Sequence, residues 1–220
     1  MSFLIKYKMS LVNIIGEGAI IVVGVLFALY IDRQVEEREH NELSFEYAER
    51  LRDDIVSDTA HYNLVEGIID AQIGSQSKIV SMQPISIEEI DHNLIVSAIA
   101  LNSGTYDVLI SQDALKHIDD KDLYFKIAKY YSDQDFYEAF NTQKVRKYNT
   151  YIDLLTSYGV FKANEINKVI FDEIFQDKVV RAVCEVRLSY NFFYKDELEK
   201  RKSSAVELIE ELNNYLTLKD

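Results

Sequence analysis

The chain has 220 residues and a formal net charge of −13, from 24 basic and 37 acidic residues. This acidic balance argues against a nucleic-acid partner, because binding to phosphate backbones rewards basic surfaces. One cysteine excludes an intrachain disulfide, and one proline with seven glycines is too few turn-forming residues for a β-rich fold. The composition therefore predicts an all-α protein.

The first element along the chain is an apolar run, Leu11–Ile31, with 21 residues and a single formal charge, Glu17. As a helix the run would be roughly 32 Å long, enough for a bilayer core of about 30 Å. A cleaved signal peptide has a shorter apolar core and a small-residue cleavage site. A buried core helix is a second alternative, but this run is apolar on every side. We predict a cytoplasmic N-terminus over residues 1–10, a transmembrane helix over 11–31, and a soluble helical domain with a stalk over 32–220.

Basic residues near the ends of the run indicate its orientation. Lys6 and Lys8 precede it, whereas Arg33 and Arg38 follow it among several acidic residues. Because basic residues gather on the cytoplasmic side, we predict a cytoplasmic N-terminus and an extracytoplasmic body. Membrane lipid is then one expected partner.

Glu17 is the sharpest feature of the predicted span, because a carboxylate in a membrane is costly unless it is protonated, reaches the interface or meets a partner. Helical spacing places Glu17, Gly24 and Ala28 on one side, where the two small residues would let another helix approach closely. Two interpretations stay open: a helix-packing position, and a proton-binding carboxylate that faces a partner channel. The pattern predicts a homo-oligomer or a complex with another membrane protein.

The residues after the predicted span have apolar positions at spacings of three and four, which predicts one long stalk helix from Asp32 to about Ile73. A break is expected between Gly74 and Pro84. Ser86 and Glu89 then match a capping box, S-x-x-E, ahead of a helix that is expected to run from Ile90 to Leu101.

Four further helices are predicted by the same criteria: a short one capped by Thr105, a long one from Asp119 or Asp120 to about Tyr158, a short one over residues 163–175, and a last long one from about Asp177 to Leu216. Gly159 is expected to close the second of these in a left-handed conformation. The predicted fold is all-α: a single N-terminal transmembrane helix that continues into a long stalk helix, followed by an antiparallel helical bundle.

The sequence contains no zinc-protease, phosphate-loop, dinucleotide-binding or serine-hydrolase motif. Glu37 and His40, and Asp58 and His61, have acid-x-x-His spacing, but they lie on one helix and cannot supply two facing helices of a metal bundle. Cys184 lies in an apolar helical run without a neighbouring base, so we expect a buried, inert thiol. We predict no catalytic residue, no cofactor and no metal.

Two stretches carry a family resemblance. GEGAIIVVGVLFALYIDRQVEEREHNELSFEYAERLRDDIVSD covers residues 16–58, and TYDVLISQDALKHIDDKDLYFKIAKYYS covers residues 105–132. Together they resemble a family of uncharacterised bacterial single-pass membrane proteins, a domain of unknown function with a GVLFAL-type anchor before a charged helix. Gln112 and Asp113 stand where that family usually has Ser-Gly. The resemblance implies a mostly helical protein of the bacterial inner (cytoplasmic) membrane, and it implies no activity.

These patterns together predict a membrane-anchored helical interaction or scaffold protein. The alternative is an accessory subunit of a proton-driven membrane complex that uses Glu17. An enzyme with a carboxylate site is a third possibility, which the missing motifs disfavour.

Overall fold

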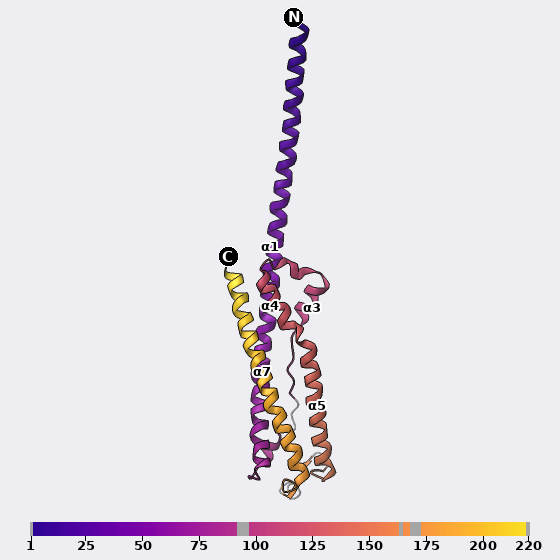
Figure 1. The fold of residues 1–220 in the computed structure, drawn as a ribbon, viewed down its shortest axis with the longest axis vertical. Helices are drawn as coiled ribbons and strands as arrows, with labels where there is room; N and C mark the ends of the chain where they lie inside the picture. Colours follow the sequence, from indigo (N-terminus) through magenta and orange to yellow (C-terminus); the bar gives the residue numbers. More distant parts are fainter. Residues whose placement is uncertain (1, 92–96, 163–164, 168–172, 219–220) are drawn as a thin grey trace. The chain divides into compact units, whose positions relative to one another are not determined.

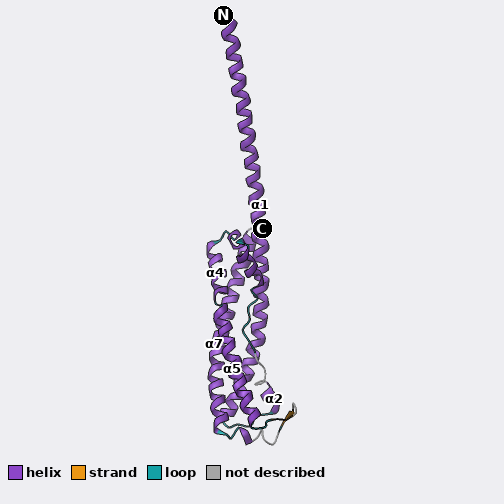
Figure 2. Ribbon diagram, turned by 90° about the vertical axis from the view of Figure 1, so that its right-hand side faces the viewer, coloured by secondary structure: helices purple, strands orange, loops and turns teal. Residues whose placement is uncertain are grey.

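The computed structural model describes residues 2–91, 97–162, 165–167 and 173–218, and within them the side chains at 2–19, 90–91, 162 and 165 are not described. These ranges are mostly helical, as Figures 1 and 2 show. The chain divides into two compact units, Met1–Tyr47 and Ala48–Asp220. The all-helical fold class is therefore confirmed.

The first unit consists of the beginning of α1 (Ser2–Val80), which is helical without interruption. From Ile20 to Ile31 every side chain is exposed, Gly24 faces open space and Ala28 contributes a small exposed methyl group. No helix in the described part of the chain has a stretch long and apolar enough to cross a membrane. The predicted span begins at Leu11, and its residues before Ile20, including the side chain of Glu17, lie outside the described side chains.

The second unit is a helical bundle built from the rest of α1 with α4 (Lys121–Ser132), α5 (Gln134–Ser157) and α7 (Lys178–Leu218). Its buried positions follow alternating spacings of three and four, the heptad pattern of coiled-coil-like packing. On α1 the positions of this series are Ala48, Leu51, Ile55, Asp58, Tyr62, Val65, Ile69, Gln72, Gln76 and Ile79, and Ser75 is buried beside them. On α7 they are Val180, Cys184, Arg187, Asn191, Tyr194, Leu198, Arg201, Ala205, Leu208, Leu212 and Tyr215.

Cross-helix contacts give the helix directions within the bundle. Lys195 of α7 binds Asp70 of α1, and Lys202, one heptad later on α7, binds Glu66, which comes earlier on α1. The two helices are therefore antiparallel. Figure 1 shows α5 running in the direction of α1 and α7 returning in the opposite direction. The predicted antiparallel bundle is confirmed at this level.

The predicted break between Gly74 and Pro84 occurs only in the last part of that range, because α1 continues seven residues beyond the predicted end at Ile73 and ends at Val80. Met82 then has a positive φ of 56°. The capping box is also present: Ser86 N–H donates to Glu89 Oε2 at 2.9 Å, and Glu89 N–H donates to Ser86 Oγ at 3.2 Å. It opens the short helix α2 (Ile87–Asp91).

The prediction that this helix continues to Leu101 is wrong. Residues 92–96 lie outside the described part, but Ser97–Ser103 is non-helical and runs lengthwise between the helices, visible as a thin thread in Figure 2. We call it the inner loop. Ser97 and Ile99 are buried while Ala100 is exposed, so burial follows the two-residue period of an extended chain rather than a helical period.

Because the inner loop is not helical, its backbone groups do not hydrogen-bond to one another as they would in a helix. Side chains of the bundle provide hydrogen-bond partners for them instead. Ile99 N–H donates to Asn141 Oδ1 at 3.0 Å and to the Tyr194 hydroxyl at 2.7 Å, and Asn141 Nδ2 donates to the Ile99 carbonyl at 2.7 Å. His61 Nε2 lies 2.9 Å from the Ala98 carbonyl. Because its buried backbone groups find these partners, the loop can replace a helix inside the bundle.

The single helix predicted from Asp119 or Asp120 to Tyr158 is two helices, α4 and α5, separated at Asp133. Its start and end were predicted correctly. Asp120 Oδ1 caps α4 by accepting from two backbone N–H groups. Gly159 has a φ of 73° beyond the end of α5. The break is explained by Arg201, whose Nη1 donates at 2.6 Å to the Tyr130 carbonyl in the last turn of α4 and so satisfies a helix-end acceptor.

The helix predicted over residues 163–175 is wrong over residues 165–167, whereas residues 173–174 are helical as predicted. Glu165–Ile166 forms β2, which pairs antiparallel with β1 (Phe161–Lys162), and residues 163–164 and 168–172 lie outside the described part. Asn167 N–H extends the pairing by donating to the Val160 carbonyl at 2.7 Å. The last predicted helix is confirmed as α7, with Asp177 Oδ1 capping its first turn.

Two short elements complete the order of the chain between the inner loop and α4. They are α3 (Gly104–Ser111) and the 3₁₀ helix η2 (Ala114–His117). The predicted cap, Thr105, lies inside α3, and Ser103 occupies the N-cap position.

Candidate functional site

A groove of about 410 Å³ lies between the outer sides of α5 and α7. Val179 and Val186 line it on α7 and remain 54% and 56% exposed, and Ala182 lies exposed between them. The two valines are seven residues apart, so they lie on one side of the helix. Phe193, seven residues further, is 50% exposed. These residues form an outer apolar stripe, separate from the buried heptad positions of α7.

The groove is basic although the chain is strongly acidic. Arg146 and Lys147 of α5 and Arg187 of α7 line it, together with Gln143, Thr150 and the apolar residues of α7. No Asp or Glu is among these described lining residues. In a chain with a net charge of −13, three cations around an apolar floor form a local positive potential that favours acidic ligands.

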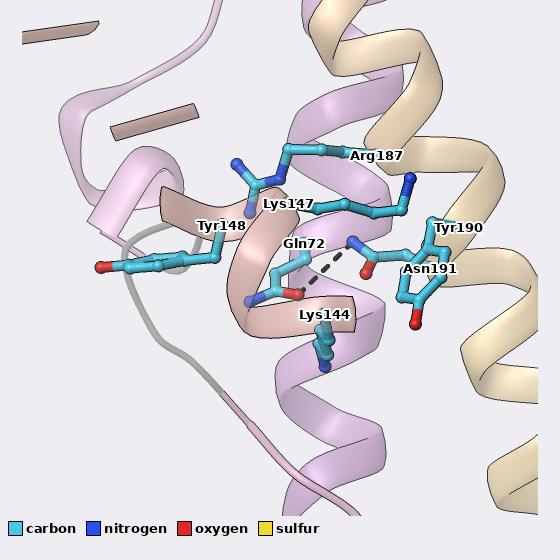
Figure 3. A pocket seen from close by; sticks show the side chains of 7 residues that line it. All are labelled: Gln72, Lys144, Lys147, Tyr148, Arg187, Tyr190 and Asn191. Carbon is cyan, nitrogen blue, oxygen red and sulfur yellow. Dashed lines mark hydrogen bonds between the residues drawn. The ribbon is translucent and has the colours of Figure 1, made fainter. Parts of the chain in front are cut away.

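A small basic cavity shares Lys147 and Arg187 with the groove, and Figure 3 shows the residues that line it. Its volume is about 10 Å³, room for roughly one water molecule. Lys144 is 6% exposed; its Nζ donates to Ser97 Oγ at 2.6 Å and lies 3.8 Å from the centre of the Tyr194 ring. Burial, helped by the charge of Arg187, lowers the pKa of Lys144 to about 7.

Arg187 connects the cavity to the groove. Its side chain is 6% exposed, and its guanidinium carbon lies 4.1 Å from the centre of the Tyr151 ring. Burial lowers the pKa of Arg187 from its usual value. A guanidinium stays charged under ordinary conditions, so Arg187 keeps a positive charge at the floor of the groove.

The inner wall of the cavity is an amide cluster. Asn191 Nδ2 donates to Gln76 Oε1 at 3.1 Å and to Gln72 Oε1 at 3.4 Å, the latter drawn in Figure 3. All three amides occupy buried heptad positions, where polar pairs fix helix register at some cost in stability. The cluster joins α7 to α1 through side chains of both helices.

A second polar cluster lies nearer the C-terminal end of α7. Asp58 and Tyr62 of α1 and Arg201 of α7, which also occupy buried heptad positions, form it together with Tyr130 of α4. The Tyr130 hydroxyl donates to Asp58 Oδ2 at 3.1 Å and lies 3.3 Å from the Tyr62 hydroxyl, while Asn102 N–H donates to Asp58 Oδ1 at 2.8 Å. Burial raises the pKa of Asp58. Arg201 covers the Tyr130 ring at 3.5 Å. These contacts hold α1, α4, α7 and the inner loop together, which is a structural role.

The residues predicted from the sequence as a site lie elsewhere. Gly24 and Ala28 are on α1 in the first unit, and the side chain of Glu17 is outside the described set. Cys184 is buried as predicted, and burial raises the pKa of its thiol to about 11. Within the described residues no group of three or more His, Cys, Asp or Glu could hold a metal ion.

Sequence reasoning missed the groove. The available signal was the outer series Val179, Val186 and Phe193, which is offset from the buried seam of α7. The basic residues of the groove come from two helices that only the fold brings together.

Comparisons with protein-family models, with curated proteins and with solved structures found no match for this chain. The resemblance to a family of bacterial single-pass membrane proteins therefore stays a prediction.

Proposed function

We propose that the chain is a membrane-anchored helical interaction or scaffold protein of the bacterial inner membrane. Its body would offer the groove between α5 and α7 to a partner, and its N-terminal helix would hold that body at the lipid surface. The observation that carries the proposal is the groove itself, an exposed apolar stripe with three cations on an acidic molecule.

Support for the anchor comes from the run Leu11–Ile31, whose single formal charge is Glu17. The described part of this run, Ile20–Ile31, is helical and exposes its large apolar side chains to the surroundings. Side chains of this kind are stable in hydrocarbon and unfavourable in water. Lys6 and Lys8 support a cytoplasmic N-terminus and an extracytoplasmic body.

Support for an interaction role comes from the bundle. Its buried ionisable groups, such as Asp58, Lys144 and Arg201, are in contact with structural partners, as their hydrogen bonds and ring contacts show. The exposed apolar stripe of α7, by contrast, has the composition of a contact surface, because apolar patches rimmed by polar residues mark interaction sites.

The test is purification of the full tagged chain from membranes in a mild detergent, with identification of co-purifying proteins. We expect a stable partner or a homo-oligomer that survives washing. A chain that is extracted without detergent and elutes alone as a monomer would refute the proposal. A reporter fused after Asp220 tests the orientation separately, because activity confined to the cytoplasm would exclude an extracytoplasmic body.

Glu17 supports the second candidate, an accessory role in a proton-driven complex, because a carboxylate in an apolar span is an expensive feature. Glu17→Gln separates the two functions. Loss of co-purification would support a packing role for Glu17. A complex that assembles normally but loses a proton-dependent phenotype would favour proton coupling.

A further inference from the structure

We infer that the groove between α5 and α7 binds an acidic amphipathic helix of another protein, whose apolar residues cover Val179 and Val186 and whose carboxylates meet Arg146, Lys147 and Arg187. This inference rests on the proposed interaction function and names the chemistry of the partner.

The apolar part of the argument starts from geometry. Val179 and Val186 are one heptad apart, with Ala182 between them, and more than half of each valine is exposed. A helix laid along α7 would present apolar residues at the same spacing and place them between the valines. Small Ala182 lets such a helix approach closely, and the outer stripe extends to Phe193 for one further heptad.

Charge selects among the helices that could fill this groove. Its described lining has three cations and no carboxylate, so a basic helix would be repelled and an acidic helix would be attracted. Arg187 is nearly buried and its charge is weakly screened by solvent, which strengthens attraction for a carboxylate placed at the groove floor.

The same charges disfavour a symmetric dimer through this surface. A two-fold contact uses the same patch on both copies, so it would bring two basic grooves together. Like charges in such a contact cost free energy. The occupant is therefore a different, acidic surface.

The experiment measures binding of the full chain, in mild detergent, to a pair of synthetic peptides. The acidic peptide is a helix-forming chain of about 20 residues, long enough for roughly 30 Å of helix, with two leucines one heptad apart and glutamates on both flanks. Its twin has lysine in place of every glutamate. We expect the acidic peptide to bind at least about tenfold more tightly than the twin, and this preference to shrink as salt rises.

Matched variants locate the binding surface. Val186→Asp should weaken binding of the acidic peptide by about tenfold or more, because it adds a carboxylate to the apolar floor. Val206→Asp is the control, a valine of the same helix that is 58% exposed and lies outside the groove lining. The double variant Arg146→Glu/Lys147→Glu should reverse the preference and favour the basic twin.

Three results would overturn the inference: equal binding of the two peptides, equal weakening by Val186→Asp and Val206→Asp, or no binding of either peptide. A fourth such result would come from the oligomeric state measured by sedimentation. If the wild-type chain is an oligomer and Val186→Asp is a monomer, the groove is occupied by a second copy of this chain. If a co-purifying partner is retained by Val186→Asp, the interaction function holds and the groove is not its site.

Discussion

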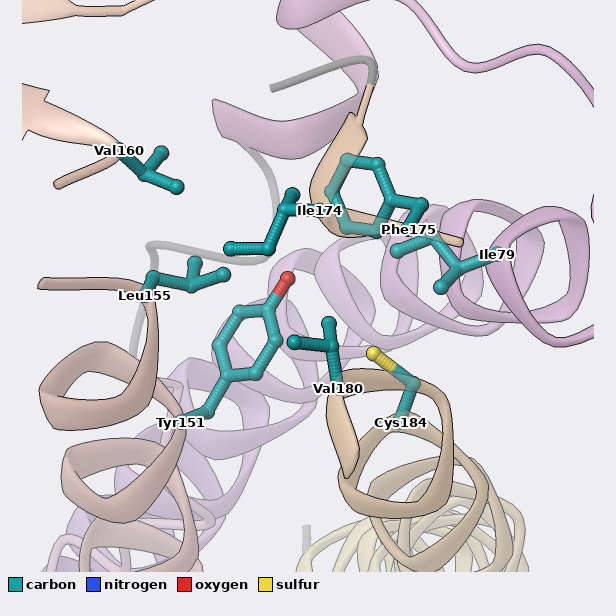
Figure 4. Close-up of a cluster of buried hydrophobic side chains, with 8 residues drawn as sticks. All are labelled: Ile79, Tyr151, Leu155, Val160, Ile174, Phe175, Val180 and Cys184. Atoms are coloured by element: carbon teal, nitrogen blue, oxygen red, sulfur yellow. The ribbon is translucent and has the colours of Figure 1, made fainter. Parts of the chain in front are cut away.

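The bundle has an apolar cluster where α7 begins, which we call the apolar end, and a polar cluster around Asp58 and Arg201, which we call the polar end. Buried apolar residues such as Leu51 and Leu208 continue beyond the polar cluster. The apolar end, drawn in Figure 4, gathers Ile79, Leu155, Val180 and Cys184 with four further buried residues. The polar end places Asp58 and Arg201 at equivalent positions of α1 and α7. The apolar end is held by burial of surface, which is non-directional. The polar end depends on particular hydrogen bonds, so it specifies which residues meet.

The largest expected effect is a carboxylate at the apolar end. Val180→Asp should destabilise the fold by about 4 kcal/mol or more, because the new charge would be buried without a partner. Val179→Asp, one residue earlier and 54% exposed, should change the free energy of unfolding by less than about 0.5 kcal/mol. Urea unfolding followed by circular dichroism measures both. Similar losses in the two variants would show that the apolar end is not closed to water.

The next effect is at the polar end. Arg201→Met keeps the length of the side chain but removes the donor to the Tyr130 carbonyl and the charge over the Tyr130 ring. We expect a loss of about 2 kcal/mol, the sum of one charged hydrogen bond and one cation–π contact less the gain from burying methionine. Arg201→Lys should fall between wild type and Arg201→Met. If Arg201→Met were more stable than wild type, the guanidinium would fix the alignment of α7 against α4 while lowering the stability of the fold.

Lys144 lies between the two ends and gives a pH-dependent effect. Its pKa is about 7 in the folded chain and about 10.5 in the unfolded chain, so between these values the unfolded chain binds more protons. Stability should therefore rise with pH in this window. From pH 7 to pH 9 wild type should gain about 2 kcal/mol relative to Lys144→Met. Parallel pH profiles for the two chains would show that Lys144 titrates normally.

The smallest effect concerns the inner loop. Tyr194→Phe removes the hydroxyl that accepts from Ile99 N–H and donates to Asn141 Oδ1. Because Asn141 still accepts from Ile99, the expected cost is only about 1 kcal/mol. Amide hydrogen exchange at Ile99 should become faster, whereas exchange in the middle of α7 should keep its protection. If amide exchange at Ile99 did not change, the hydrogen bond to Asn141 alone would be enough to hold the inner loop in place.

The apolar heptad positions of the bundle were largely predictable from the sequence, and the polar ones were not. Positions such as Leu51, Ile55, Val65 and Ile69 follow helical spacing, and the caps at Ser86, Asp120 and Asp177 have local signatures. Asp58 and Gln72 occupy the same seam, but a polar residue there is indistinguishable from a solvent-facing one until its partner is known. Those partners are far away in the chain.

The inner loop shows why the remaining errors occurred. The sequence from Ile90 to Leu101 has enough apolar residues for a helix, yet the bundle supplies Asn141 and Tyr194 to bond its backbone. Such partners reverse a local preference. The break at Asp133 is similar, because the donor that ends α4, Arg201, is 71 residues away from Tyr130.

The hydrogen bonds of Ile99 also set an order of events during synthesis. Its first partner, Asn141, is 42 residues downstream and its second, Tyr194, is 95 residues downstream. A ribosome must therefore complete the first 17 of the 41 residues of α7, as far as Tyr194, before the inner loop can adopt its final partners. Until then the apolar residues that α7 covers in the complete bundle lack their partners, and exposed apolar surface of this kind favours aggregation.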